Sequence, residues 1–365
     1  PEFTQLDLEM SFVRPDDVME LIEGLLAYVF KEAAGVEIEL PIRRLTYDEA
    51  MNRYGSDKPD LRFNLPLVDL SEALRGCGFQ VFTGALAAGG VVKGINAGPA
   101  DAWARREIDQ LVEAARGYGA KGLAWVVYSL GEARGPVAKF LSRAELDSVA
   151  AAMEAKEGDL LLFVADQRAV ANEVLGRLRL DIAQKLGLIA EGQFALCWVT
   201  HWPLLEWSEE ERRYVAMHHP FTSPEPGDLD LLETDPARVR AQAYDIVLNG
   251  VELGGGSVRI HSRDVQLRVF KALGIGEEEA KAKFGFLMEA FEYGAPPHGG
   301  IALGLDRIVM LLAGCASIRD VIAFPKTQKA ACLLTGAPSR AEKRQLDELG
   351  IQLRPEVEAL FSEGT

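Results

Sequence analysis

The stretch YDIVLNGVELGGGSVRIH, residues 244–261, carries three consecutive glycines inside a run rich in valine and isoleucine. A glycine in the interior of a strand lowers its stability, so it usually marks a β-bulge or a place where another group approaches the backbone closely. Acidic residues precede the glycines and Arg259 follows them. We therefore predict that this stretch forms the floor of an active site.

The spacing of the charged residues in this stretch sets a condition on the strand. Glu252 and Arg259 are seven positions apart, so a regular strand would point them to opposite faces. If both residues serve one site, a bulge has to lie between them. We predict this bulge at 254–256, which leaves Ser257 and Arg259 together on the face of the site.

A second glycine-rich segment, PPHGGIALGLDR (296–307), follows a predicted helix over 277–293. It predicts a strand over 299–303 and then an apolar helix over 305–313. Arg307 falls in the first turn of this helix, where the helix dipole disfavours a basic side chain. An arginine there is better explained by an anion that binds at the same helix end.

The opening residues 1–12 alternate polar and apolar positions, which predicts a half-buried strand. One face carries apolar side chains: Leu6, Leu8, Met10 and Phe12. The other face carries polar side chains: Gln5, Asp7 and Glu9. The polar face is either solvated or part of a pocket in which Gln5 and Asp7 bind a cationic group. A domain rarely begins inside a strand, so we expect this chain to belong to a longer one.

The length of 365 residues indicates two domains, or one domain with an insertion. Between residues 64 and 193, strand patterns alternate with helical patterns, which is typical of an α/β unit. The predicted strands are 78–83, 122–128 and 159–165, the predicted helices are 99–116, 142–156 and 167–186, and 84–98 predicts a loop with short extended parts. We therefore divide the chain into residues 1–63, an inserted unit at 64–193, and residues 194–365.

The segments outside the insertion predict further helices over 16–33, before Gly55, over 236–248 and over 340–349, and a buried strand over 194–200. The first helix has an apolar stripe of Val18, Leu21, Leu25, Val29 and Phe30. The helix over 236–248 would deliver Asp245 and Asn249 to the glycine stretch.

Two adjacent histidines, His218 and His219, stand in the segment MHHPFT. Paired histidines suggest a metal ion, but adjacent residues on a strand point in opposite directions and rarely share one. We therefore expect these histidines to contact a substrate or to have a structural role.

The composition argues against several classes of protein. The net charge of −16 argues against binding of nucleic acid over the whole surface, although a local basic face remains compatible with it. The four cysteines form no CxxC pair, so neither a zinc site nor a disulfide framework is indicated. We expect no signal peptide and no membrane span, and a cytoplasmic protein with no membrane partner.

The charged residues near the glycines match three kinds of ligand. Asp245 and Glu252 carry the oxygen ligands that suit Mg²⁺ together with phosphate oxygens. Arg307 suits a polyphosphate, and Arg259 has a donor fork that suits a carboxylate. A nucleotide, a metal ion and an acidic small molecule would together use all of these groups. The alternative is that the acids and arginines only pair with one another.

The same residues identify the chain as similar to bacterial-type aspartyl-tRNA synthetases, which are class II aminoacyl-tRNA synthetases. PEFTQLDLE (1–9) resembles the second half of class II motif 2, and GGIALGLDR (299–307) resembles motif 3. ELGGGSVR (252–259) and MHHPFT (217–222) are similar to the amino-acid pocket of that family. GSDKPD (55–60), followed by about 130 residues of α/β pattern, resembles the site of its inserted GAD domain.

The resemblance implies an α+β fold, in which helices flank the antiparallel sheet of a class II synthetase and an α/β GAD-type domain is inserted. It implies an aspartate–tRNA ligase that forms aspartyl-adenylate from L-aspartate and ATP and then charges tRNA(Asp). For aspartate, it implies that Arg259 binds the side-chain carboxylate, that Gln5 and Asp7 bind the ammonium group, and that His218, His219 and Ser257 lie in the same pocket with His218 nearest the substrate. For Mg²⁺, it implies the ligands Asp245 and Glu252. For ATP, it implies contacts with Glu252, Gly304, Leu305, Asp306 and Arg307. Arg259 and Arg307 would be the catalytic residues.

Some parts of the family pattern have no counterpart in the sequence. These are the anticodon-binding domain, motif 1 with its homodimer interface, the first half of motif 2 and a further aspartate-binding loop. We therefore expect this chain alone to activate aspartate weakly or not at all, and the homodimer to form in a longer protein. Two alternatives are another class II ligase, such as an asparaginyl enzyme, and a non-catalytic tRNA-binding paralogue.

Overall fold

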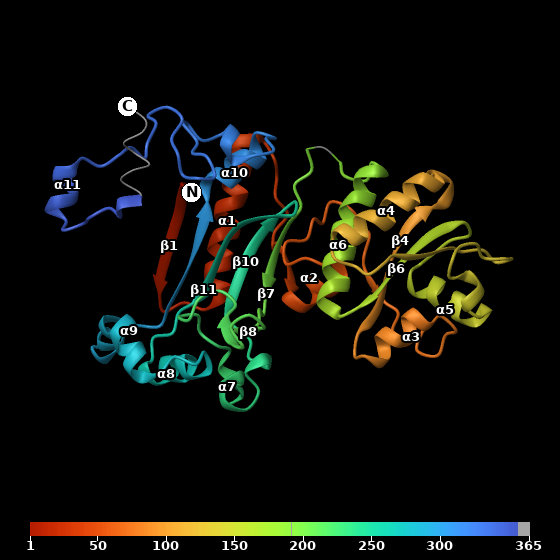
Figure 1. The fold of residues 1–365 in the computed structure, drawn as a ribbon, viewed down its shortest axis with the longest axis horizontal. Helices are drawn as coiled ribbons and strands as arrows, with labels where there is room; N and C mark the ends of the chain where they lie inside the picture. Colours follow the sequence, from red (N-terminus) through yellow and green to blue (C-terminus); the bar gives the residue numbers. More distant parts are fainter. Residues whose placement is uncertain (191, 357–365) are drawn as a thin grey trace.

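The computed structural model describes residues 1–190 and 192–356. Its largest element is a six-stranded sheet in the order β1-β12-β11-β10-β7-β2 (Figure 1). The strands are β1 (Gln5–Ser11), β2 (Arg43–Thr46), β7 (Leu196–Thr200), β10 (Ala243–Leu248), β11 (Val251–Val258) and β12 (His298–Gly304). Neighbouring strands are antiparallel except β2 and β7, which are parallel. The predicted α+β class with an antiparallel sheet is confirmed.

One face of this sheet is covered by α1 (Pro15–Ala34), which confirms the helix predicted over 16–33. Its buried side chains include Val18, Ile22 and Leu26, and they pack with Tyr244 and other apolar residues of the sheet. The buried stripe is rotated from the predicted one, because Leu21 is 46% exposed.

The remaining elements of this part lie around the sheet and past its ends. They are α2 (Tyr47–Tyr54), the hairpin β8 (Leu205–Ser208) and β9 (Arg213–Ala216), α7 (Leu231–Thr234), α8 (Arg263–Ala272), α9 (Glu277–Glu292), α10 (Leu305–Leu312) and α11 (Lys343–Glu348). The helices predicted before Gly55, over 277–293, 305–313 and 340–349 are confirmed with small shifts of their ends. Among the described residues, no helix combines the length and the apolar character that crossing a membrane requires.

A second sheet has four strands in the order β3-β4-β6-β5. They are β3 (Val68–Asp69), β4 (Val91–Pro99), β5 (Ala124–Val127) and β6 (Asp159–Asp166), and the helices are α3 (Gln80–Ala87), α4 (Arg105–Gly117), α5 (Arg143–Ala152) and α6 (Arg168–Lys185). Two apolar clusters fill the two faces of this sheet. All of these residues fall within 64–193, the range predicted for the inserted unit. The exact domain boundaries at 63/64 and 193/194 stay predictions.

Two predictions in this region were wrong. Residues 80–87 form α3 rather than a strand, because Phe79 and Phe82, three positions apart, pack edge to face at 4.8 Å and bury Phe82 against the sheet. Residues 91–99 form β4, the second strand of the sheet, rather than a loop. Gly94 is required there because a Cβ would lie 3.0 Å from Leu162 O and from two side chains.

The helix predicted over 236–248 was also wrong. Only Pro236–Arg238 is helical, as a 3₁₀ turn, and Ala243–Leu248 is β10. β10 pairs with β11 on one side and β7 on the other, and every one of its residues is buried. A strand buried on both faces lacks the alternation that identifies strands in a sequence. Phe12 likewise leaves the predicted apolar face, since it follows β1 with φ 59° and is 79% exposed.

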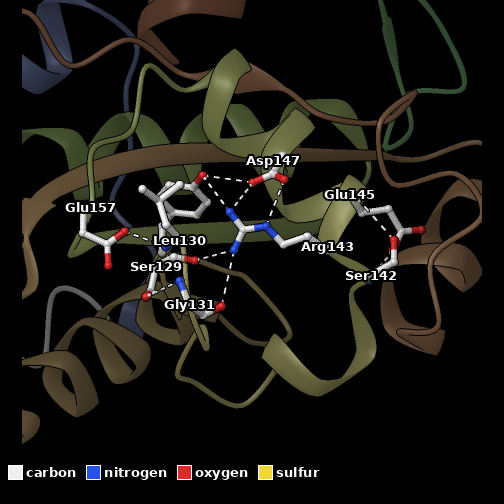
Figure 2. A network of polar contacts seen from close by, with 9 residues as sticks. Ser129, Leu130, Gly131, Ser142, Arg143, Glu145, Asp147 and Glu157 are labelled. Carbon is white, nitrogen blue, oxygen red and sulfur yellow. Dashed lines mark hydrogen bonds and ion pairs between the residues drawn. The ribbon is translucent and has the colours of Figure 1, made fainter.

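A polar network fixes the loop after β5 to α5 (Figure 2). The guanidinium of Arg143 forms an ion pair with Asp147 at 2.6 Å and donates to Ser129 O at 2.7 Å. Glu157 accepts a hydrogen bond from Leu130 N at 2.5 Å. The loop is therefore part of the fold of the four-stranded sheet.

A buried arginine joins the two sheets. Arg179 of α6 is 1% exposed, and its guanidinium donates to the carbonyl oxygens of Asp60, Phe63 and Leu65, each at 2.9 Å. The guanidinium also lies 4.0 Å from the centre of the Phe63 ring. Burial lowers the pKa of Arg179 to about 10, which leaves it charged at neutral pH.

We expect Arg179→Met to lower the free energy of unfolding by about 3 kcal/mol, because three buried carbonyl groups lose a charged donor. Urea unfolding followed by circular dichroism measures this change. Arg177→Met is the matched control, since Arg177 is exposed and pairs with Glu173 on the same helix. Equal losses in the two variants would contradict the anchoring role of Arg179.

Candidate functional site

A cavity of about 470 Å³ opens over strands β1, β12, β11 and β10. This volume is in the range of small-molecule sites. The lining residues are Phe3, Gln5, His218, His219, Thr222, Asp245, Glu252, Leu253, Gly254, Gly255, Gly256, Ser257, Arg259, Ala302, Gly304, Asp306, Arg307 and Ile318. All of the predicted site residues line this cavity except Asp7 and Leu305.

A β-bulge in β11 brings Glu252 to the face of the cavity. Ile246 pairs with Gly254, but the next residue of β10, Val247, pairs with Glu252, so Leu253 is the extra residue. Asp245 and Val247 share a face of β10, and their partners Gly255 and Glu252 therefore share that face of β11. The predicted bulge exists, but it lies one residue before the glycines.

A side chain at each of the three glycine positions would collide with a neighbouring atom. A Cβ on Gly255 would lie 2.6 Å from Asp245 Oδ1, so this position keeps the carboxylate in the cavity. A Cβ on Gly254 would lie 2.2 Å from Ala302 O, and one on Gly256 would lie 2.1 Å from Gly300 O. These two glycines therefore allow β11 and β12 to approach closely.

The guanidinium of Arg259 is held from several sides. Its Nε and Nη2 donate to Glu9 Oε1 at 3.0 and 2.6 Å, and its Nη1 donates to Ser257 Oγ at 2.7 Å. Nη1 also lies 3.3 Å from Nε2 of His219. These contacts fix the guanidinium beside the cavity, as a carboxylate-binding role requires. The pairing of Arg259 with Glu9 also agrees in part with the alternative interpretation, in which the acids and arginines near the glycines pair with one another.

His219 is neutral at physiological pH. Burial lowers its pKa to about 4, and the positive charge of Arg259 acts in the same direction. Nδ1 of this neutral imidazole accepts from Phe221 N at 3.2 Å, and the guanidinium charge 3.3 Å from Nε2 disfavours a second proton on the ring.

We expect the NMR titration of His219 in the folded protein to have its midpoint near pH 4, compared with 6.5 in urea. Because the folded state holds the lower pKa, the contribution of this group to stability is present above pH 6.5. That contribution is lost as the pH falls from 6.5 towards 4. A folded-state midpoint at or above pH 6 would contradict the buried, neutral imidazole.

Asp245 and Glu252 form an acid pair at the other end of the cavity. The Asp245 side chain is 8% exposed, and burial raises its pKa, with the charge of Glu252 acting in the same direction. Nε2 of His218 lies 3.8 Å from Asp245 Oδ1 and opposes that rise.

The acid pair fits a divalent cation. Asp245 Oδ1 is buried and has no hydrogen-bond partner among the described residues, and a carboxylate oxygen of that kind suits Mg²⁺. No group of three or more histidine, cysteine, aspartate or glutamate residues that could hold a metal ion occurs within 1–190 and 192–356. A Mg²⁺ ion here would therefore complete its shell with phosphate oxygens and water.

The start of α10 closes the acidic end of the cavity. Arg307 Nη1 donates to the backbone oxygen of Glu252 at 2.7 Å and lies 4.0 Å from its Oε1. Asp306 accepts from Thr4 N at 2.6 Å, which ties α10 to the beginning of β1. Leu305 does not line the cavity and is 45% exposed.

The polar face of β1 borders the cavity. Gln5, Asp7 and Glu9 pair with Gly304, Ala302 and Gly300 of β12, so all three lie on the side of Asp245 and Ser257. Gln5 lines the cavity, and Asp7 is exposed next to it.

The two histidines do not lie on a strand, contrary to the prediction. Residues 217–221 form bends and a turn, and both His218 and His219 line the cavity. The ring of His218 packs edge to face with Trp202 at 4.8 Å. Adjacent side chains point in opposite directions only on a strand, so that argument does not apply to His218 and His219.

Several residues at the site were missed by the sequence interpretation. Glu9 shares the polar face of β1, and this alternation could have suggested it. Lys58, whose Nζ lies 3.0 Å from Glu252 Oε2, stands in the GSDKPD loop. Phe3 and Thr222 stand inside PEFTQLDLE and MHHPFT, so these two motifs could have suggested them. Ile318 lies outside every motif, and only the tertiary structure brings it to the cavity.

The site can be compared with known proteins. The family model described as tRNA synthetases class II (D, K and N) matches residues 1–328, and the chain belongs to this family. The resemblance to class II synthetases predicted from the sequence is thereby confirmed.

The curated relatives include aspartate–tRNA ligases. The aspartate–tRNA ligase of Geobacillus kaustophilus is 59% identical over 350 residues, which are 96% of this chain and 59% of that protein. The aspartate–tRNA(Asp/Asn) ligase of Caldanaerobacter subterraneus is 55% identical over 353 residues, which are 97% of this chain and 60% of that protein. The chain thus spans about three-fifths of the length of the curated relatives it matches.

A solved structure, the aspartyl tRNA synthetase from Entamoeba histolytica, covers 90% of this chain and 44% of its own chain at 17% identity. Its TM-score is 0.40.

Proposed function

We propose that the chain is the aspartate-activating part of an aspartate–tRNA ligase, which forms aspartyl-adenylate from L-aspartate and ATP and then transfers the aspartyl group to the 3′ end of tRNA(Asp). The observation that carries this proposal is the separation of two kinds of charge along one cavity. Arg259 and Glu252 are seven residues apart on one extended segment, or roughly 20 Å at the rise of a strand. An acidic substrate bound at Arg259 and a metal-bound polyphosphate bound near Glu252 would match the charges at the two ends of the cavity. The names of the curated relatives support the same substrates.

In this proposal, the side-chain carboxylate of aspartate takes the place of Glu9 at the two-pronged Nε–Nη2 edge of Arg259. Ser257 Oγ accepts from Nη1 and holds the guanidinium in its orientation. Gln5 and Asp7 receive the ammonium group, and the two histidines close the pocket, with His218 nearest the substrate. Selectivity against asparagine follows, because a neutral amide leaves the charge of Arg259 poorly matched.

The other end of the cavity would hold ATP. Gly304 to Arg307 would contact the nucleotide, with Arg307 on the γ-phosphate. Asp245 and Glu252 would hold Mg²⁺, which supplies positive charge to the phosphate oxygens. The α-carboxylate of aspartate would attack the α-phosphate in line and displace pyrophosphate, so these residues have to position the reactants and neutralise charge. No protein nucleophile is needed.

The test is ATP–pyrophosphate exchange in the complete natural protein, with aspartate and asparagine compared as substrates. We expect exchange to depend on aspartate, and charging to follow with tRNA(Asp). Because the curated relatives include both aspartate and aspartate/asparagine tRNA ligases, tRNA(Asn) is assayed beside tRNA(Asp). Greater stimulation by asparagine than by aspartate would point to an asparaginyl-type ligase, and no exchange with either would favour a non-catalytic paralogue.

A further inference from the structure

Lys58 gives the acidic end of the cavity a positive charge of its own. Its Nζ lies 3.0 Å from Glu252 Oε2 and 3.9 Å from Asp57 Oδ2. Glu252 lines the cavity, and Lys58 is not among the residues that line it. The other oxygen of Glu252 lies 4.0 Å from Arg307. Glu252 is therefore held between two cations.

The loop that carries Lys58 is fixed by the fold. Gly55 ends α2 with φ 69°, and a Cβ there would lie 2.2 Å from Asn172 O of α6. Lys58 N donates to Ser56 Oγ at 3.0 Å, and Asp60 O accepts from the buried Arg179. An ordinary surface ion pair costs the ordering of two flexible side chains. Here the backbone of one partner is already held in place.

The acid pair remains only partly compensated by this lysine. Asp245 Oδ1 is the oxygen that is buried without a hydrogen-bond partner among the described residues, and its side chain is 8% exposed. The cavity thus keeps one carboxylate oxygen for an incoming cation, while Lys58 holds an oxygen of the second carboxylate.

We propose that Lys58 is a built-in counter-ion of the Asp245–Glu252 pair, which opposes tight binding of a lone divalent cation and admits a cation that arrives with a polyphosphate. The inference rests on the proposed function, since it concerns the ATP end of the same site. A positive charge a few ångströms from the site repels a free dication. It does not repel a metal–triphosphate complex, whose net charge is negative. The free protein would therefore take up its metal ion with the nucleotide rather than before it.

The test uses Lys58→Met in the complete natural protein, with Mn²⁺ as the probe and electron paramagnetic resonance of free Mn²⁺ as the readout. We expect the variant to bind Mn²⁺ alone about tenfold more tightly than the parent protein, because a unit charge is removed beside the site. Binding of Mn²⁺ together with ATP should change less than about twofold. Lys58→Arg keeps the charge and should restore the affinity of the parent.

Two further variants show where the effect arises. Lys121→Met removes a lysine that pairs with Asp166 in the four-stranded sheet, and it should leave Mn²⁺ binding unchanged. In a Glu252→Gln background, Lys58→Met should produce a smaller gain than tenfold, because the lysine and the metal ion no longer compete for Glu252 and only their direct repulsion remains.

Equal or weaker Mn²⁺ binding by Lys58→Met would overturn the proposal. Weaker binding would mean that the lysine orients Glu252 for the metal instead of competing with it. No detectable binding by this variant at millimolar Mn²⁺ would overturn it as well. The Mn²⁺-alone arm needs no aspartate and no turnover, so its outcome is separate from a failure of the pyrophosphate exchange assay.

Discussion

Arg259→Met is expected to lower kcat/KM for aspartate in pyrophosphate exchange by about 10³-fold or more. Removing one partner of a close, hydrogen-bonded charge pair costs about 2–5 kcal/mol, and about 4 kcal/mol corresponds to that factor. The arginine is 20% exposed and contacts Glu9, Ser257 and His219, so no neighbouring side chain can replace its geometry. The variant should also lose its preference for aspartate over asparagine.

The controls for this prediction separate charge from geometry. Arg259→Lys retains the charge but lacks the two-pronged donor group, so we expect intermediate activity. Arg263→Met removes an exposed arginine that pairs with Glu292 at 3.4 Å, and it should leave exchange unchanged. If Arg259→Met kept the activity of the parent, Arg259 would not be the carboxylate-binding residue.

Gly255→Ala is expected to lower exchange activity by about 10²-fold or more and the free energy of unfolding by about 1–3 kcal/mol. The added Cβ would lie 2.6 Å from Asp245 Oδ1, and the buried Asp245 on β10 has little room to move away. The carboxylate would have to leave its place in the cavity. Pyrophosphate exchange and urea unfolding measure the two effects.

Gly24→Ala is the matched control for this substitution. Gly24 lies in α1, and a methyl group on its Cα would have no neighbouring atom within 4 Å, so the same chemical change should stabilise the helix by about 0.5–1 kcal/mol. A Gly255→Ala protein that is as active as the parent would show that Asp245 need not stay where the structure has it.

The local part of the site could be predicted from the sequence. The glycines indicated close packing, which the structure confirms, because that signal depends on neighbouring residues alone. The helix start at Arg307 is confirmed too, and the anion site there stays a prediction. The bulge was also predictable from the parity of Glu252 and Arg259. The position of the bulge could not be predicted, because the glycines are needed for close contacts with neighbouring atoms and not for the bulge. The extra residue is Leu253, whose side chain is buried in the core.

The non-local part could not be predicted. The contact of Glu9 with Arg259 depends on β1 and β11 both pairing with β12, which brings residues 250 positions apart together. Lys58 reaches Glu252 only because α6 holds its loop. The sequence of β10 predicts a helix because a strand buried on both faces has no alternation, and its partners decide its conformation.

The order of strands in the six-stranded sheet has a consequence for synthesis of the chain on the ribosome. β1 and β2 come before the residues of the four-stranded sheet, and β7, β10, β11 and β12 come after them. The smaller sheet is therefore fully translated while the larger one still lacks most of its strands, and domains generally fold as units in the order of translation. β12, the strand that pairs with β1 among the described residues, emerges about 290 residues after it. The cavity, which needs β1 and β12 side by side, would then be among the last features of the described residues to form.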